Sequence, residues 1–215
     1  ETAMSLIFYD SMLSDITSEE RMDNVSSQGY AWGYIGSCIP FVISLALVLG
    51  ADKIGISMST AMMIAFIICA VWWIGVSMPL IKTYHQPQKQ QAQKSNVFGE
   101  IRKILCEIGA DKKILLFLIA YFFYIDGVYT IIDMATAYGS ALGLDTVGLL
   151  LALLLTQIVA FPSSIIIGRL SKKVETRKMI MVCISAYLGI AIFAIFMTSQ
   201  LHFWILAVAV GLFQG

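Results

Sequence analysis

Charged side chains are scarce in this sequence. Asp, Glu, Lys and Arg together make up 13% of the 215 residues, whereas about a quarter of a soluble domain is charged. Hydrophobic residues make up 59%. This composition excludes an ordinary soluble domain and directs attention to how the apolar residues are grouped.

Cysteines are also few and widely spaced. No pair has the CxxC spacing of a zinc or redox site, so we expect neither a metal site nor a disulfide framework. No cofactor is expected either. The four cysteines, which we interpret as small packing residues, are Cys38, Cys69, Cys106 and Cys183.

Long apolar runs dominate the chain. A helix needs about 20 apolar residues to cross the hydrocarbon core of a bilayer, whereas the strands of a barrel alternate over about ten residues. The sequence therefore predicts an all-α fold, a polytopic transmembrane helical bundle. The runs extend over residues 31–49, 58–81, 114–142, 147–170, 179–197 and 203–215.

Both ends of the sequence are expected to lie within spans. The first residue is Glu1, the stretch Met4–Tyr9 has the composition of the tail of a span, and the last apolar run continues to Gly215. We therefore expect this chain to be a piece of a longer one.

The 14 Lys and Arg residues indicate the sidedness of the spans. When successive loops are assigned to alternate sides, 13 of these residues fall on one side and Lys53 alone falls on the other. Because short loops rich in Lys and Arg stay in the cytoplasm, we interpret the first side as cytoplasmic. Topology accounts for the basic residues, so no nucleic-acid partner is expected.

A polar segment divides the runs into two groups. Its first part, residues 82–96, is rich in Gln and predicted to be mobile. In its second part, Phe98, Ile101, Leu105 and Ile108 recur at intervals of three and four, which predicts a short amphipathic helix. Two interpretations stay open: the helix lies on the cytoplasmic membrane surface, or it packs on other cytoplasmic loops.

Two acidic residues lie well inside an apolar run. They are Asp126 and Asp133. The runs offer no Lys or Arg at a similar depth to pair with them, because Arg169, the one basic residue within their bounds, is next to last in the run over 147–170. A charge at the bilayer centre costs about 2.5–3.5 kcal/mol on insertion scales, so such residues tend to face a protein interior or a water-filled cavity. The two share one helix face with Tyr129 and Thr130. We interpret this stripe as a substrate or proton-coupling site, with Asp126 near the midplane and Asp133 nearer the external mouth.

The run that holds both aspartates is longer than a straight crossing needs, so we expect a tilted, projecting or broken helix. Gly127 is the expected break point, because broken helices at the midplane often line transport sites. In the alternative, Asp126 has the structural role of capping a break at Gly127, and Asp133 is an interface residue that reaches water.

The next run supplies a predicted neighbour for Asp126. Gln157 lies near the midplane of that run, with Ser164 on the same face, and we predict an Asp126–Gln157 cluster. Pro162 is expected to kink the helix, and Ser163 or Ser164 would then satisfy the freed backbone groups.

Small residues mark the start of the first full run. Gly29, Gly33 and Gly36 are spaced so that another helix can approach closely, and we interpret them as helix-packing residues. A direct part in a conformational cycle is the alternative. The residues expected to cap this helix are Asn24, Ser26 or Ser27.

Two blocks of sequence resemble a known family. The stretches "FYDSMLSDI…ERMDNVSSQGYAWGYIGS" and "YFFYIDGVYTIIDMATAYG…QIVAFPSSIIIGRLSKK" are similar to the bacterial UMF1 branch of the major facilitator superfamily. That branch is itself similar to the autophagy-related vacuolar effluxers of fungi. The resemblance implies a fold of twelve spans in two six-helix halves, of which this chain holds the end of span four to the start of span ten. It also implies three parts: residues 1–81 as the end of the N-terminal half, 82–113 as a cytoplasmic linker, and 114–215 as the start of the C-terminal half.

The stretch "GRLSKKVETRK" resembles the superfamily's cytoplasmic loop motif. Gly168, Arg177 and Lys178 fit that motif, and Arg169 lies in the same segment. Two positions depart from it. Lys172 stands where the motif has Asp, and Glu175 lies in the region of its second Gly, which weakens the charge-relay role that the motif implies.

The expected function is secondary active transport of a small polar solute by alternating access, in the bacterial cytoplasmic membrane. The fungal relatives imply amino acids as one substrate class, and Asp126 would bind a proton or a substrate ammonium. A non-transporting scaffold or receptor with a structurally buried Asp126 is the alternative.

An enzymatic role for the two aspartates is disfavoured by their spacing. The paired carboxylates of an aspartyl protease share a proton at about 3 Å, whereas seven residues of one helix separate Asp126 from Asp133 by about 10 Å. We therefore expect a protein that is not an enzyme, and whose partners are a solute, the bilayer and, where transport is coupled, a proton.

Overall fold

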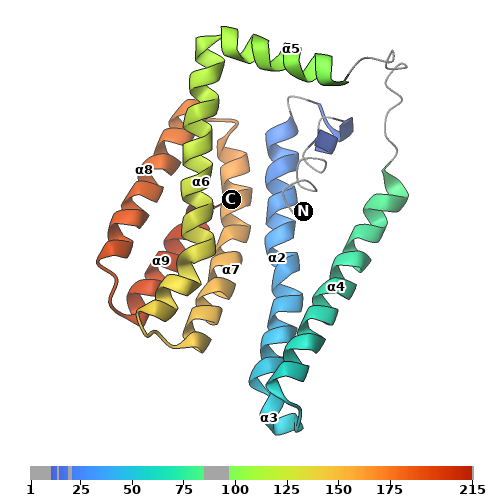
Figure 1. The fold of residues 1–215 in the computed structure, drawn as a ribbon, viewed down its shortest axis with the longest axis vertical. Coiled ribbons are helices and arrows are strands. Elements are labelled where there is room, and N and C mark those ends of the chain that lie inside the picture. The colour runs from blue at the N-terminus through green and yellow to red at the C-terminus, as the bar shows by residue number, and fades with distance from the viewer. Residues whose placement is uncertain (1–10, 14, 19–20, 85–96, 215) are drawn as a thin grey trace. The chain divides into compact units, whose positions relative to one another are not determined.

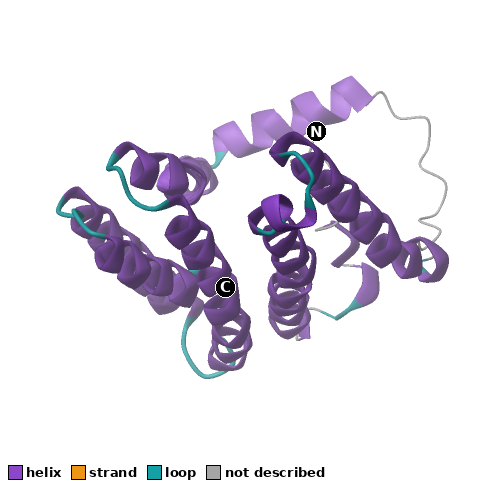
Figure 2. Ribbon diagram, turned by 90° about the horizontal axis from the view of Figure 1, so that it is seen from below, coloured by secondary structure: helices purple, strands orange, loops and turns teal. Residues whose placement is uncertain are grey.

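The computed structural model of the protein describes residues 11–13, 15–18, 21–84 and 97–214. All regular secondary structure in these ranges is helical (Figure 2), which confirms the all-α prediction. The helices are α2 (Met22–Leu49), α3 (Ala51–Ile54), α4 (Met58–Thr83), α5 (Val97–Ala110), α6 (Lys112–Ala141), α7 (Thr146–Leu170), α8 (Thr176–Ile195) and α9 (Gln200–Phe213).

Five of these helices are long and apolar enough to cross a membrane. They are α2, α4, α6, α7 and the part of α8 from Arg177 to Ile195, while α9 is a shorter apolar helix. Two predicted features lie wholly or mostly outside the described residues: the span tail at Met4–Tyr9, and residues 85–96 of the segment 82–96 that was predicted to be mobile. The first two residues of that segment, Lys82 and Thr83, end helix α4.

The start of α2 differs from the prediction. The helix begins nine residues before the apolar run, so Asn24, Ser26 and Ser27 lie inside it and none of them is its N-cap. The residue at the cap position is Arg21, whose side chain makes no capping hydrogen bond. Ser27 Oγ donates instead to the carbonyl of Asp23, 2.7 Å away and one turn earlier, a bond that a hydroxyl inside a helix commonly makes.

Short corners connect the helices. Ser57, Asp145 and Ser199 accept backbone N–H bonds as the N-caps of α4, α7 and α9, which satisfies amides that have no partner inside the helix. Gly55 and Gly143 adopt φ angles of 77° and 74° at the turns after α3 and α6. Residues with a Cβ rarely adopt this conformation, so these two turns require glycine.

The described helices form two compact units. One contains α2, α3, α4, α7, α8, α9 and the end of α6 from Gly139, and the other contains α5 and α6 up to Tyr138. These units do not coincide with the three parts that the resemblance implies, and those parts stay a prediction.

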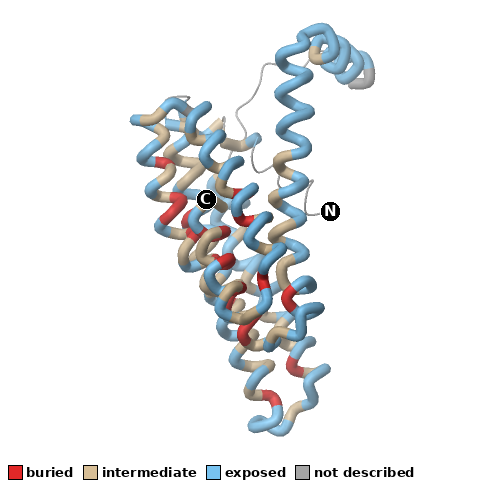
Figure 3. Tube along the Cα trace, turned by 90° about the vertical axis from the view of Figure 1, so that its left-hand side faces the viewer, coloured by how far each residue is buried: buried red, intermediate tan, exposed pale blue. Residues whose placement is uncertain are grey.

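Helix α7 is the centre of the larger unit, because it contacts both α2 and α9 (Figure 1). In lipid the hydrophobic effect does not drive helices together, so small residues that allow close approach carry the packing. Buried residues are sparse along the helices (Figure 3), and many large apolar side chains are exposed. The buried residues of α7, all but one of them small, are Gly148, Leu149, Ala152, Thr156, Ala160, Ser163, Ser164 and Gly168.

A hydroxyl group joins α7 to α9. Thr156 Oγ1 lies 3.0 Å from the carbonyl oxygen of Ala152 in its own helix and 3.2 Å from that of Ala207 in α9, and it donates toward both. Hydrogen bonds between membrane helices contribute about 0.6 kcal/mol on average. The bond to Ala207 therefore orients the two helices more than it holds them together.

Helix α7 continues through Pro162. We predicted that Ser163 or Ser164 would donate a hydrogen bond to the backbone carbonyl that Pro162 leaves without a partner. Ser163 Oγ donates instead to the carbonyl of Leu212 in α9. Ser164 is fully buried, and its Oγ has no hydrogen-bond partner among the described residues.

Gly211 of α9 provides a test of this packing. A Cβ added there would lie 2.7 Å from the carbonyl oxygen of Thr156 and 3.1 Å from Cβ of Val159. Gly211→Ala is therefore expected to destabilise the full-length protein by about 1–3 kcal/mol, measured as a lower Tm in detergent. The matched control is Gly189→Ala on α8, where an added Cβ meets no atom within 4 Å and alanine favours the helix by up to about 1 kcal/mol. Equal stability of the two variants would contradict the close contact of α7 with α9.

Candidate functional site

The predicted polar stripe lies on one face of α6, in the smaller unit. Asp126, Tyr129, Thr130 and Asp133 all have exposed side chains. Asp126 lies 14 residues after Lys112 and 15 before Ala141, which is about 21 Å and about 22 Å at roughly 1.5 Å per residue. The structure thus has an ionisable group at the middle of a span-length helix, and its side chain is exposed. Its role as a substrate or proton site stays a prediction.

Helix α6 is continuous through Gly127, so the predicted break at this residue is wrong. A glycine in a helix interior costs about 1 kcal/mol relative to alanine. A helix of 30 residues with an intact hydrogen-bond ladder tolerates that cost. The alternative in which Asp126 caps a break falls with it, because a cap requires backbone N–H groups that are free.

Gln157 of α7 lies in a cavity of the larger unit. The cavity has a volume of about 550 Å³, and the Oε1 atom of Gln157 is buried without a hydrogen-bond partner among the described residues. An amide oxygen accepts hydrogen bonds from N–H and O–H groups, so a solute with such a donor would satisfy it. The other residues that line the cavity are Met12, Leu13, Ile16, Val25, Ser26, Gly29, Tyr30, Gly33, Tyr34, Ser37, Leu80 and Tyr84.

Two tyrosines that line this cavity donate hydrogen bonds to other parts of the chain. Tyr34 Oη donates to the carbonyl of Gln214 at 2.9 Å, and Tyr84 Oη donates to Oδ2 of Asp15 at 2.9 Å. The hydrogen bond to Asp15 raises the pKa of Tyr84, which lies just beyond the end of α4. The hydroxyl of Tyr84 therefore stays protonated and keeps donating at neutral pH.

Asp126 and Gln157 belong to different units. The predicted cluster of these two side chains therefore stays a prediction.

The glycines of α2 lie beside the cavity. Gly29 and Gly33 line it, and a Cβ added to Gly33 or Gly36 would meet no atom within 4 Å. Among the described residues, these two glycines do not make the close helix contact expected of them, and the packing role of the three glycines stays a prediction. Helices α2 and α7 make a close contact at another position, since a Cβ added to Gly168 would lie 2.5 Å from Cβ of Ser27.

The segment that resembles the cytoplasmic loop motif begins inside α7. Gly168 is buried there, whereas Arg169, Arg177 and Lys178 are exposed. Lys178 Nζ lies 3.6 Å from Oε2 of Glu175, and an ion pair so exposed contributes little to stability. The charge-relay role of this loop stays a prediction.

The close packing of α7 was not predicted, although its sequence contains a signal for it. Small residues recur there every four positions, which is the spacing of one helix face, and the structure buries all of them. This repeat would have predicted α7 as the most closely packed span and Gly168 as a contact residue. Its members are Ala152, Thr156, Ala160, Ser164 and Gly168.

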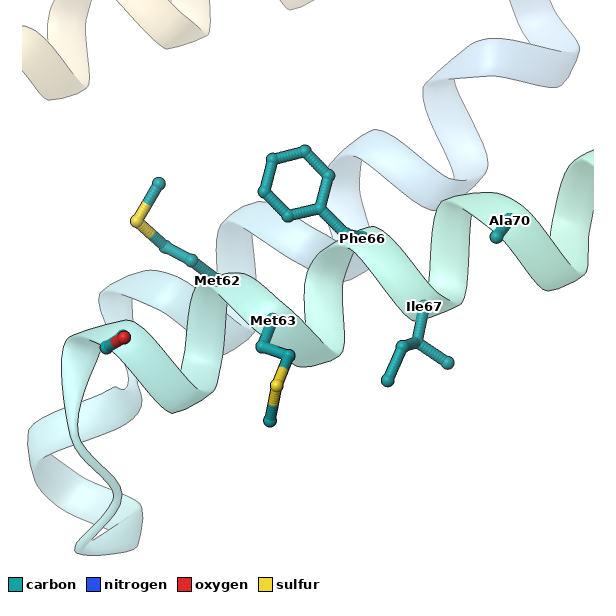
Figure 4. Close-up of a pocket in the computed structure, with 6 residues that line it drawn as sticks. Met62, Met63, Phe66, Ile67 and Ala70 are labelled. Atoms are coloured by element: carbon teal, nitrogen blue, oxygen red, sulfur yellow. The ribbon is translucent and has the colours of Figure 1, made fainter.

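A further pocket lies on the surface of α4 (Figure 4). All of its lining residues come from this one helix, with Met62 and Phe66 pointing to one side and Met63 and Ile67 to the other. The only hydroxyl in the lining belongs to Ser59. This surface suits lipid chains or a neighbouring span, and it offers no group of polar atoms to a solute.

Comparison with known proteins identifies relatives of the chain. Residues 11–215 match the model of the family described as vacuole effluxer Atg22 like. A Bacillus subtilis (strain 168) protein named as an uncharacterized MFS-type transporter, YxiO, is 44% identical over 214 residues, which cover 97% of this chain and 50% of the relative. The chain thus spans half the length of this curated relative. No solved structure matches the chain.

The match to the family model extends over nearly the whole chain, and the bacterial relative is named as a transporter of the major facilitator type. These matches confirm the resemblance to the major facilitator superfamily that was inferred from the sequence. Together with the five span-length helices, they also confirm the prediction of an integral, multi-pass membrane protein. The chain belongs to the Atg22-like vacuole effluxer family, within the transporters of the major facilitator type.

Proposed function

We propose that this chain forms part of a proton-coupled secondary transporter that moves a small polar solute by alternating access. Amino acids are the substrate class that the family resemblance implies. The single observation that carries the proposal is Asp126, an ionisable residue at the middle of a span-length helix, with an exposed side chain.

The position of Asp126 gives the proposal its physical basis. A charge at the bilayer centre is costly, and residues that carry one tend to face a water-filled cavity or a protein interior. Binding a proton or a substrate ammonium neutralises the carboxylate. A site that must lose its charge before it closes to water, and regains it when it opens, couples proton movement to the conformational change.

The neighbours of Asp126 on α6 extend the proposed site. Tyr129, Thr130 and Asp133 follow at intervals of three, four and seven residues, so the stripe runs along one side of the helix. Their hydroxyl and carboxylate groups offer hydrogen bonds to a polar solute along a path toward the external mouth.

Alternating access would involve the contact between α2 and α7. Helix α2 belongs to the first half that the resemblance implies, and α7 belongs to the second. Rocking of the halves about a midplane site therefore requires these helices to move against each other at the contact of Ser27 with Gly168.

The scaffold or receptor alternative is less well supported. It expects Asp126 to be structurally buried, whereas its side chain is exposed. The cavity beside Gln157 also favours a transporter, because a buried acceptor without a partner is costly unless a ligand satisfies it.

Replacement of Asp126 tests the proposed coupling. In the full-length protein reconstituted in vesicles, Asp126→Asn is expected to reduce pH-driven transport at least about tenfold, because an amide cannot bind and release the proton. The substrate is first identified by a thermal-shift screen of small solutes, and uptake is then measured at several pH gradients. The matched control is Asp52→Asn on α3, which should transport like the wild type. Unchanged rate and pH dependence in Asp126→Asn would overturn the coupling role.

Replacement of Gln157 tests the cavity separately. Gln157→Leu keeps the size of the side chain but removes the buried acceptor, so the apo protein should remain as stable as the wild type or become slightly more stable. The Tm increase caused by the solute should be lost, because its hydrogen-bond partner is gone. Gln28→Leu, on the exposed side of α2, is the control. A full solute-induced Tm increase in Gln157→Leu would show that the solute binds elsewhere.

A further inference from the structure

Helices α5 and α6 meet at a corner formed by a single residue, Asp111. Its backbone N–H donates to the carbonyl of Glu107 at 3.2 Å, which ends α5. Its carboxylate Oδ1 accepts the N–H groups of Lys113, at 2.9 Å, and Ile114, at 3.4 Å, which caps α6. One residue thus terminates one helix and starts the next, and this leaves the chain little freedom between them.

The corner sends α5 across the end of α6 (Figure 1). Helix α6 has the length and composition of a membrane span. Where α6 crosses the bilayer, a helix that lies across its end would run along the membrane surface and not away from it into the cytoplasm. The covalent connection would hold α5 near that surface, so that even a weak attraction to lipid would suffice for binding.

One side of α5 is apolar. Ile101, Ile104 and Leu105 are 49%, 54% and 63% exposed, and Ile108 follows at helical spacing. At about 100° per residue, these four positions fall within an arc of roughly 100°. Such a stripe on a helix with a charged opposite side is typical of helices that lie in the interfacial region of a bilayer.

The charged side of α5 has a balanced composition. Residues 97–113 carry four cations, at positions 102, 103, 112 and 113, and three anions, at positions 100, 107 and 111, so their net charge is +1. Lys103 Nζ lies 3.9 Å from Oε1 of Glu107 in an exposed pair, which contributes little. Attraction to anionic lipid is therefore modest, and the apolar stripe must provide most of the attraction to the membrane.

We propose that the apolar stripe of α5, formed by Ile101, Ile104, Leu105 and Ile108, binds the bilayer itself, at the boundary between headgroups and acyl chains of the cytoplasmic leaflet. The structure thereby favours the first of the two interpretations that the sequence leaves open. Lipid is the occupant because the stripe adjoins a membrane span through a capped corner. The proposal is independent of the transport function, since it concerns only how the linker is held.

Site-directed fluorescence measures directly whether the apolar stripe of α5 contacts lipid. Single cysteines replace Ile104, Leu105, Lys103 or Glu107 in the full-length protein, with the native cysteines changed to serine, and each carries an environment-sensitive fluorophore in lipid nanodiscs. Ile104 and Leu105 are expected to be quenched by doxyl-labelled lipid at least about twofold more than Lys103 and Glu107, and to be protected from iodide by a similar factor. The fluorophore's own affinity for lipid is common to all four positions, so the Lys103 and Glu107 variants serve as matched controls.

The other outcomes of this measurement overturn the proposal. If Ile104 and Leu105 are protected from both quenchers, a protein surface covers the stripe. If all four positions are quenched alike by iodide, α5 lies in water. A change from pure phosphatidylcholine to a mixture with about 30% phosphatidylglycerol should alter the quenching by less than about twofold, because the segment has little net charge. A much larger change in quenching would show that the basic residues, and not the apolar stripe, bind the membrane.

Discussion

The absence of water from the hydrocarbon core is the constraint on which this structure depends. Every backbone N–H and C=O group in the core must find its partner inside the span, which favours unbroken helices. Helix α6 shows the strength of this requirement, because it runs unbroken past Gly127 and past two aspartates. The same constraint leaves shape and a few interhelical hydrogen bonds as the means of packing. Helix α7 therefore contacts two neighbours through small side chains.

The cost of burying polar groups in lipid also explains where chemistry can occur. Most surfaces of the described helices are apolar and suited to lipid, as the exposed residues of α4 illustrate. Against this background, a carboxylate at the middle of α6 and a buried amide oxygen in the cavity beside α2 stand out as groups that need a partner. In the transporter proposed above, a solute or a proton that arrives from water would be the partner of these groups.

The spans could be predicted from the sequence because each one is a property of its own segment. Length and composition suffice to identify them, and the structure has a helix at every predicted run. Features that depend on neighbouring helices could not be predicted in this way. The first residues of α2, from Met22 onward, precede the apolar run, so composition does not identify them as helical. The contact of Ser27 with Gly168 joins residues that are far apart in the chain. The break expected at Gly127 does not occur, because the cost of about 1 kcal/mol for a glycine in a helix is small compared with the cost of breaking backbone hydrogen bonds in lipid. The site could be predicted only residue by residue, since its assembly depends on how helices meet.

The most direct test is whether water reaches position 126 inside the membrane. In the full-length protein without native cysteines, Asp126→Cys is treated with a membrane-impermeant, thiolate-specific reagent from each side of the vesicle. We predict modification from at least one side, while Val128→Cys, on the opposite face of α6, stays unmodified until the protein is denatured. If Asp126→Cys also reacts only after denaturation, no aqueous path reaches the carboxylate, and the proposed carrier mechanism is wrong.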